Sequence, residues 1–404
     1  MSVTKPPVRK AAASKSPRPA SLRPSDLRAL VDLSSLAAEG VIDIGEGLHQ
    51  SVRSTLGLAP GATPERCGGL SGAVYGLVRG LQGGVAGGLS RGLERLERVL
   101  DQGAPQDPAP RRLALLSVLN GVLGDRLAER GNPLALEAGL RLDGLPLAAA
   151  LAGPARRRGP LSRHVVVLLH GLCMNDVQWR SASDPGHGEA LANALGATVV
   201  HARYNSGLGI GRNGALLSEQ LETLLQCWPV PIERISLVGH SMGGLIARSA
   251  ELAARRSGHR WRLQLRDIAT LGSPHRGAPL ERIGRSCERA LAAVPYAGHF
   301  ARIGSMRSQG ILDLGDGRVA DEAEQPLPSD VRALAVAART LRGEVRGLGG
   351  WVGDGLVPAD SALGLPCENP RGLDARCISS TGHLELLRSG EVRRWLIEWL
   401  GDPA

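Results

Sequence analysis

The chain has 404 residues, enough for one large domain with an extension or for two domains, and 43% of its residues are hydrophobic. Its formal net charge of +9 would suit a nucleic-acid-binding protein, but most of this charge lies in one short segment. The first 24 residues contain six basic and no acidic side chains, which leaves 42 basic and 39 acidic residues elsewhere, a net charge of +3. This near balance argues against a phosphate-binding surface on the body, so we expect no nucleic-acid partner.

The first 24 residues are rich in Pro, Ser, Ala and basic side chains and lack the apolar stretch of a secretory signal. They are predicted to form a disordered basic tail. No run of 18 apolar residues occurs, so the sequence predicts no spanning helix and a cytoplasmic protein. The six cysteines lack a C-x-x-C pair and indicate neither a zinc site nor a disulfide framework, and we expect no metal or cofactor. Only Cys367 and Cys377 are close enough in sequence to bridge a loop.

Residues 25–130 are predicted to form an N-terminal helical extension that begins with an apolar stripe over 25–56. Glycine then recurs every fourth residue, at positions 72, 76, 80, 84, 88 and 92. On a helix this row forms a groove for another backbone, but each glycine costs about 1 kcal/mol relative to alanine. The helix therefore needs a partner. That partner is the main domain or a second subunit, or alternatively a membrane or lipid surface, which implies peripheral membrane association; the oligomeric state stays open.

The main domain is predicted to span residues 131–404. Immediately before it, 111–130 has the pattern of an amphipathic helix that ends at a Gly-x-Pro stop. Alternating residues over 134–142 lead into an Asp-Gly turn signal at 143–144, and a second strand is predicted from Leu145 onward. The main sheet is predicted to start with this hairpin.

Strands and helices alternate from residue 164 onward. This pattern indicates an α/β fold in which a mostly parallel sheet is covered by helices on both faces. Residues 280–328 interrupt the rhythm and are predicted to form a cap insertion, whose apolar side chains either wall the site or fill a small local core. The predicted strands cover 164–169, 197–204, 235–238, 267–271, 331–338 and 375–379, and the predicted helices cover 186–195, 216–227, the stretch after Ser241 up to Arg255, and 392–400.

The segment ISLVGHSMGGLIARS has the form of a nucleophile elbow, a sharp strand-to-helix turn with a serine at its apex. The turn pushes the hydroxyl of Ser241 above the sheet and demands small residues two positions away on either side. Gly239 and Gly243 meet this demand, with His240 and Met242 between them. The pentapeptide alone is a weak signal in a chain with 54 glycines, so the strand before it and the helix after it decide the interpretation.

A serine nucleophile needs a base, and the base needs a third group to orient it. On a doubly covered parallel sheet these groups lie at the carboxyl ends of strands. His383 follows the predicted strand 375–379 and is the candidate base. Asp354 follows the strand 331–338 and is the candidate acid, with Asp360 as the main alternative and a simple turn role for Asp354 as another. The order Ser, Asp, His is that of α/β-hydrolases.

Two backbone N–H groups are predicted to stabilise a developing oxyanion. One belongs to Met242, at the start of a helix, where free N–H groups and the helix dipole favour negative charge. The other belongs to Leu172, in the loop that starts with His170 and Gly171. His170 is expected to fix this loop by hydrogen bonds, with a ligand or acid/base role as the alternative.

Five motifs occur in order along the chain: HGLCMNDVQW, YNSGLGI, VGHSMGGLIARS, LGSPHRGAPLER and GDGLVPADSALG. They resemble the bacterial lipase and esterase branch of the α/β-hydrolase superfamily, near the GPI inositol-deacylase-like group. The earlier stretch LNGVLGDRLAERGNPLA resembles the extension that precedes the hydrolase core in proteobacterial members. The resemblance covers about residues 25–404 and implies an α/β-hydrolase fold.

The resemblance also implies a serine hydrolase of carboxylic esters, with Ser241, Asp354 and His383 as triad and Leu172 and Met242 as oxyanion donors. A small-molecule ester or lipid is the implied substrate. Some bacterial lipases hold a calcium ion near the histidine, but no carboxylate pair here matches that site. Acyl transfer by the same triad, and a lipid-associated protein with a vestigial hydrolase core, are the alternatives. Substrate choice is expected to depend on four side chains, namely Asn175, Asp176, Trp179 and Tyr296.

Overall fold

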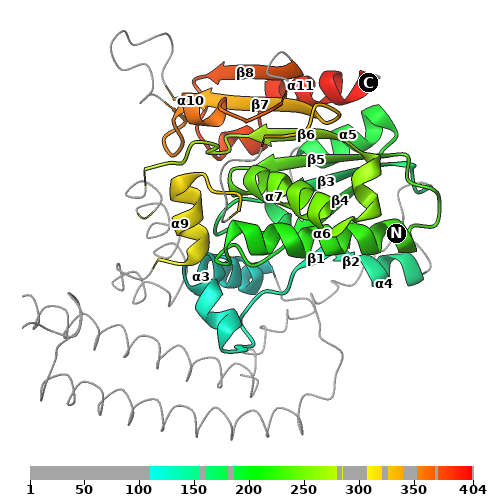
Figure 1. Cartoon of the computed structure of the whole chain (residues 1–404), viewed down its shortest axis with the longest axis horizontal. Helices are drawn as coiled ribbons and strands as arrows, with labels where there is room; N and C mark the ends of the chain where they lie inside the picture. The colour runs from blue at the N-terminus through cyan, green and yellow to red at the C-terminus, as the bar shows by residue number, and fades with distance from the viewer. Residues whose placement is uncertain are drawn as a thin grey trace, which may run out of the picture.

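The computed structural model describes residues 110–153, 160–180, 186–279, 284, 307–320, 326–340, 353–368 and 372–402. The predicted basic tail, the helix over 25–56, the glycine row and most of the cap segment lie outside these residues. Figure 1 shows the described part as a sheet packed between helices. Its first helix, α3 (Pro110–Glu129), confirms the amphipathic helix predicted at the end of the extension.

One sheet of eight strands forms in the described part, in the order β2-β1-β4-β3-β5-β6-β7-β8. The pairings from β4 to β8 are all parallel, and β1 is antiparallel to both of its neighbours. This confirms the mostly parallel sheet and brings the carboxyl ends of the parallel strands to one edge. The strands are β1 (Gly139–Leu142), β2 (Leu145–Pro146), β3 (His164–Leu169), β4 (Thr198–Arg203), β5 (Arg234–His240), β6 (Leu265–Leu271), β7 (Arg332–Arg339) and β8 (Leu373–Ser379).

The sheet begins with the predicted hairpin. Asp143 and Gly144 have φ values of 54° and 85°, the left-handed pair that a tight two-residue hairpin turn requires. The strand predicted from Leu145 onward is confirmed at its start but is short, because β2 has two residues and helix α4 (Leu147–Ala152) follows at once. The six residues LAAALA have the highest helix propensities of any side chains, which explains the early change.

Helices cover both faces of the sheet, as the alternation predicted (Figure 1). Val165, Val167 and Leu169 of β3 pack into one apolar cluster with α6 (Ile210–Cys227) and α7 (Met242–Ser257). Val166 and Leu168 point to the other face and pack with α5 (Gly186–Leu195) and α11 (Gly390–Gly401). All five side chains are fully buried, so the continuous apolar run in this strand follows from burial on both sides.

Two helices differ from the sequence expectations. Helix α6 begins at Ile210, six residues earlier than predicted, because the polar and glycine residues of its first turns hide the apolar stripe. Helix α9 (Gln309–Asp316) lies in the described part of the cap segment, and its Ile311 and Leu314 pack into the main core. None of the helices in the described ranges is both long enough and apolar enough to cross a membrane.

Candidate active site

Ser241 occupies the turn between β5 and α7, as the elbow motif predicts. Its backbone has φ 54° and ψ −123°, outside the regions that non-glycine residues normally adopt. A Cβ at Gly243 would lie 2.5 Å from the carbonyl oxygen of Leu169, so only glycine lets the helix start this close to β3. The strained turn therefore fixes Ser241 at the carboxyl edge of the sheet.

His383 and Asp354 lie side by side at the same edge. The Nδ1 atom of His383 is 2.6 Å from Oδ2 of Asp354, and the two side chains are 6% and 1% exposed. The other oxygen of Asp354 accepts hydrogen bonds from the N–H groups of Leu356 and Val357, at 3.0 and 2.8 Å. Burial alone raises the pKa of Asp354, but the neighbouring His383 and these donors lower it by more, so the net pKa lies below its usual range. The carboxylate is thus ionised and oriented by three donors.

Two other aspartates near these strands lie elsewhere. Asp360, the alternative to Asp354, lies at the start of α10 (Ala359–Ala362), accepts from the N–H of Ser361 and has no histidine partner in the described part of the chain. Asp330 precedes β7 and pairs with Arg262 at 2.8 Å, at the opposite end of the strands. One oxygen of Asp354 holds the turn and the other faces His383, so the turn contacts leave the carboxylate free to orient the histidine.

A second histidine joins the loop of His383 to the elbow. The Nε2 atom of His240 lies 3.0 Å from the carbonyl oxygen of His383, and the two ring centroids are 4.7 Å apart. Since a carbonyl oxygen only accepts, His240 donates this hydrogen bond. Burial, together with the nearby His383, lowers the pKa of His240 to about 3. His240 is therefore a neutral tether at neutral pH.

Ser241 and His383 lie at the same edge of the sheet and form no hydrogen bond with each other. The hydroxyl of Ser241 forms no hydrogen bond to any residue in the described part of the chain. Hydrogen bonds between a serine and its base are often long or misaligned without substrate, so this geometry agrees with a serine nucleophile. Ser241 and His383 are each 6% exposed, so both residues are largely buried at this edge.

The two predicted oxyanion donors flank Ser241. Met242 is the first residue of α7, where a backbone N–H has no carbonyl partner within the helix. Leu172 follows Gly171, and a Cβ at Gly171 would lie 3.2 Å from Cβ of Ser241. In the described ranges neither the Leu172 nor the Met242 N–H has a hydrogen-bond acceptor. Both donors are thus available to an incoming oxygen atom.

His170 fixes the loop that carries Leu172. Its ring stacks on Tyr204 with centroids 3.9 Å apart, and its Nδ1 atom lies 2.9 Å from the carbonyl oxygen of Gly171. The Tyr204 hydroxyl donates to the carbonyl oxygen of His170. Burial lowers the pKa of His170 to about 4, so this ring is neutral at neutral pH. These contacts agree with the loop-fixing role expected for His170 and give no support to its alternative as a ligand.

The comparisons with known proteins give one family model that matches part of the chain. Residues 160–293 match the model described as the PGAP1-like alpha/beta domain. This segment is similar to that domain, and the match covers less than half of the chain. The match confirms the resemblance that the motifs predicted, and the mostly parallel sheet has the α/β-hydrolase fold. No curated protein matches the chain.

Several solved structures are similar to this chain at low identity. The mature form of lipase BlEst2 from Bacillus licheniformis is 17% identical with a TM-score of 0.42, over 61% of this chain and 96% of that one. An esterase from Pyrobaculum calidifontis is 15% identical with a TM-score of 0.42, over 76% of this chain and 95% of that one. Carboxylesterase CesB from Bacillus subtilis is 13% identical with a TM-score of 0.36, over 71% of this chain and 99% of that one.

Three of the four residues expected to select substrate form structural contacts. Asn175 caps the short helix η1 (Asp176–Trp179) by accepting from the N–H of Val177, and its amide donates to Ser117 at 2.8 Å. Asp176 forms an ion pair with Arg203 at 2.5 Å, and both are buried. Trp179 is 2% exposed and packs in the core. These contacts give the three side chains structural roles, and their contact with substrate stays a prediction. Tyr296 lies outside the described residues.

Sequence analysis missed two partners near the site. Arg203 and Ser117 hold the loop after β3, yet neither carries a local signal, because their contacts span 27 and 58 residues of sequence. Cys367 and Cys377 are free thiols in the structure, so they do not bridge a loop. No cluster of three or more His, Cys, Asp or Glu side chains suited to a metal occurs within the described ranges.

Proposed function

We propose that this chain is a carboxyl-ester hydrolase that works through an acyl-enzyme on Ser241. The observation that carries the proposal is the buried contact of 2.6 Å between His383 Nδ1 and Asp354 Oδ2, at the same edge of the sheet as the strained Ser241. Because the carboxylate accepts the Nδ1 proton, the ring lone pair lies on Nε2. That atom is the base that a serine nucleophile needs.

In the first half of the reaction, Ser241 Oγ attacks the ester carbonyl carbon while His383 Nε2 takes the hydroxyl proton. The carbonyl oxygen becomes an oxyanion, to which the N–H groups of Leu172 and Met242 donate. Collapse of this intermediate breaks the bond to the alcohol oxygen, and His383 returns its proton to the leaving alcohol. Asp354 stabilises the imidazolium that exists between these two proton transfers.

In the second half, a water molecule attacks the acyl-enzyme as His383 again takes a proton. The second tetrahedral intermediate releases Ser241, which regains its proton, and the free acid departs. The products are one acid and one alcohol for each ester and water consumed. We propose a small-molecule ester or a lipid as the substrate class, because the five sequence motifs resemble those of bacterial esterases and lipases.

The test compares wild type with Ser241→Ala on p-nitrophenyl esters of short and long acyl chains. We expect hydrolysis by wild type and a loss of at least about four orders of magnitude in kcat for the variant. A fluorophosphonate probe should label wild type on Ser241 and leave the variant unlabelled. Activity that survives the substitution, or folded wild type that the probe does not label, would overturn the proposal. Mass spectrometry with an added alcohol separates hydrolysis, which yields free acid, from acyl transfer, which yields a new ester.

A further inference from the structure

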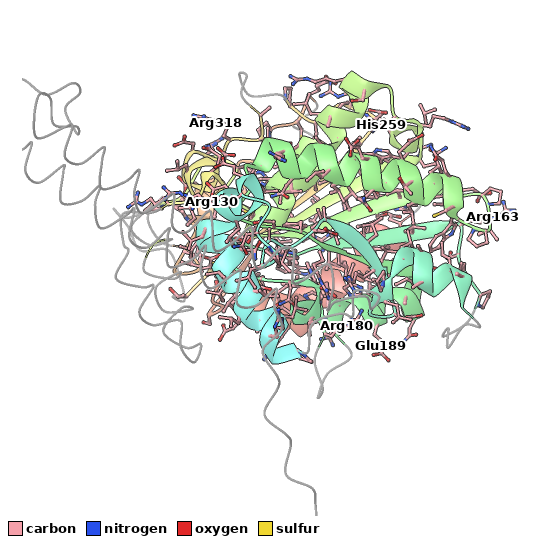
Figure 2. The ribbon with its side chains drawn as sticks, turned by 90° about the horizontal axis from the view of Figure 1, so that it is seen from below. Arg130, Arg163, Arg180, Glu189, His259 and Arg318 are labelled. Carbon is pink, nitrogen blue, oxygen red and sulfur yellow. The ribbon has the colours of Figure 1, made fainter. Side chains whose placement is uncertain are left out.

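Helix α3 precedes the PGAP1-like segment, yet it packs against the loops around the candidate site. It contacts α9 directly, and Figure 1 shows the two helices side by side. Figure 2 shows Arg130, directly after α3, and Arg318, two residues after α9, on the same side of the molecule. Helix α3 is therefore joined to the rest of the described chain at this side.

The first contact of α3 is with the loop that carries Leu172. The Asn175 amide donates to the Ser117 hydroxyl at 2.8 Å, and that hydroxyl donates to the carbonyl oxygen of Leu113 at 2.7 Å. Ser117 and Asn175 are 1% and 2% exposed. Because Asn175 also caps η1, this buried hydrogen bond ties the far end of the loop to the helix.

The second contact lies one residue from Leu172. Cys173 has a φ of 60°, which a non-glycine residue rarely adopts, and its backbone lies against Gly121 of α3. A Cβ at Gly121 would be 2.9 Å from the Cys173 nitrogen and would overlap the Cys173 sulfur. The glycine in α3 is therefore what allows the loop to lie this close to the helix.

The same turn of α3 also holds two other segments. Asn205, in the loop after β4, donates through its amide to the carbonyl oxygen of Gly124 at 2.8 Å. Ser308, which caps α9, donates through its hydroxyl to the carbonyl oxygen of Gly121 at 2.7 Å. Three segments that are far apart in sequence thus meet on one face of one helix.

We propose that α3 positions the Leu172 N–H for the oxyanion, with Ser117 and Gly121 as positioning residues that act through Asn175 and Cys173. The proposal rests on the proposed ester hydrolysis. Leu172 lies between Gly171, which packs against Ser241, and Cys173, which packs against α3, so the loop is held from both sides. An oxyanion donor must be placed to within a fraction of an ångström, which a loop achieves only when a rigid element supports it.

The test uses Ser117→Ala and Gly121→Ala, with Ala114→Ser on an exposed position of α3 as the control. The measurements are kcat and KM on a p-nitrophenyl ester, the inhibition constant of a trifluoromethyl ketone, and the melting temperature. The ketone forms a tetrahedral adduct with an oxyanion, so its affinity reports the placement of the donors. Fluorophosphonate titration counts the active sites, so kcat is expressed per active molecule.

We expect kcat to fall about threefold to tenfold in Ser117→Ala, the kinetic equivalent of one lost hydrogen bond. Gly121→Ala should lose about 10²-fold, the cost of one misplaced oxyanion donor. KM should stay within about twofold, the inhibition constant of the ketone should rise in proportion to the loss, and the control should match wild type.

Wild-type values of kcat and ketone affinity in a folded Ser117→Ala or Gly121→Ala would overturn the role of α3. A loss of activity explained entirely by fewer titratable sites would also overturn it, because α3 would then support folding alone. Wild type that neither hydrolyses esters nor reacts with the fluorophosphonate is a different result, and it refutes the proposed function itself.

Discussion

Replacing Asp354 by asparagine tests the candidate site by changing which nitrogen of His383 carries the ring proton. In the structure one carboxylate oxygen accepts from the N–H groups of Leu356 and Val357, and the other lies 2.6 Å from His383 Nδ1. An asparagine in the same place must turn its carbonyl oxygen to the two backbone donors, because its amide nitrogen cannot accept from them. The amide then donates to Nδ1 of His383, which moves the ring proton to Nε2. The ring can no longer take a proton from Ser241.

The loss expected from this wrong tautomer is about 10⁴-fold in kcat, with KM and the melting temperature close to wild type. The assay is hydrolysis of a p-nitrophenyl ester at saturating substrate between pH 6 and 9. Asp360→Asn is the matched control, because Asp360 accepts only from the N–H of Ser361 and should keep full activity. A folded Asp354→Asn enzyme within tenfold of wild type would refute the reasoning, as would an equal loss in both variants.

Two further predictions concern stability. Asp267→Ala should lower the free energy of unfolding by about 3–5 kcal/mol in urea titrations. The fully buried Asp267 carboxylate pairs with Arg234 at 2.8 Å, and the substitution leaves that arginine without this partner. The kcat per active site should not change, because Asp267 lies at the opposite end of the strands from the candidate site. His201→Leu should stabilise the protein, and more at pH 4.5 than at pH 7.5. Burial lowers the pKa of His201 to about 4 from 6.5, so the unfolded chain binds the extra proton in this window and stability falls as the pH falls, by up to about 3 kcal/mol. An unchanged pH dependence of stability in His201→Leu would contradict this, and an unchanged urea midpoint would contradict the prediction for Asp267.

The features predicted well are those whose structural cause lies within a short stretch of sequence. The run HVVVLL is apolar throughout because β3 is covered on both faces, so its pattern reports both its type and its place in the sheet. The elbow at Ser241 is recognisable because the close approach of strand and helix requires glycines two residues before and after the serine, all within five residues of sequence. His383 and Asp354 follow from strand order, since parallel strands bring their carboxyl ends to one edge.

The features missed depend on partners that are distant in sequence. Asn175 and Asp176 lie beside the candidate site in the chain, which suggested contact with substrate, but Ser117 and Arg203 bury them as structural groups. No local pattern distinguishes a polar side chain that faces a substrate from one whose partner is supplied by another element. The start of α6 was missed for a related reason, because its buried Asn213 bonds to the carbonyl oxygens of the preceding loop and is not part of an apolar stripe.

The histidines around Ser241 explain how one ring could carry the proton in the proposed reaction. Burial holds the pKa of His170 to about 4 and that of His240 to about 3, so both rings are neutral at neutral pH. Each ring also forms a hydrogen bond with a backbone carbonyl oxygen, and this bond helps to hold the loops in place. A charge on either ring would repel the imidazolium that His383 must become, and His240 is only 4.7 Å away. The His170 and His240 rings therefore stay neutral, and the Asp354 carboxylate favours a positive charge on the His383 ring.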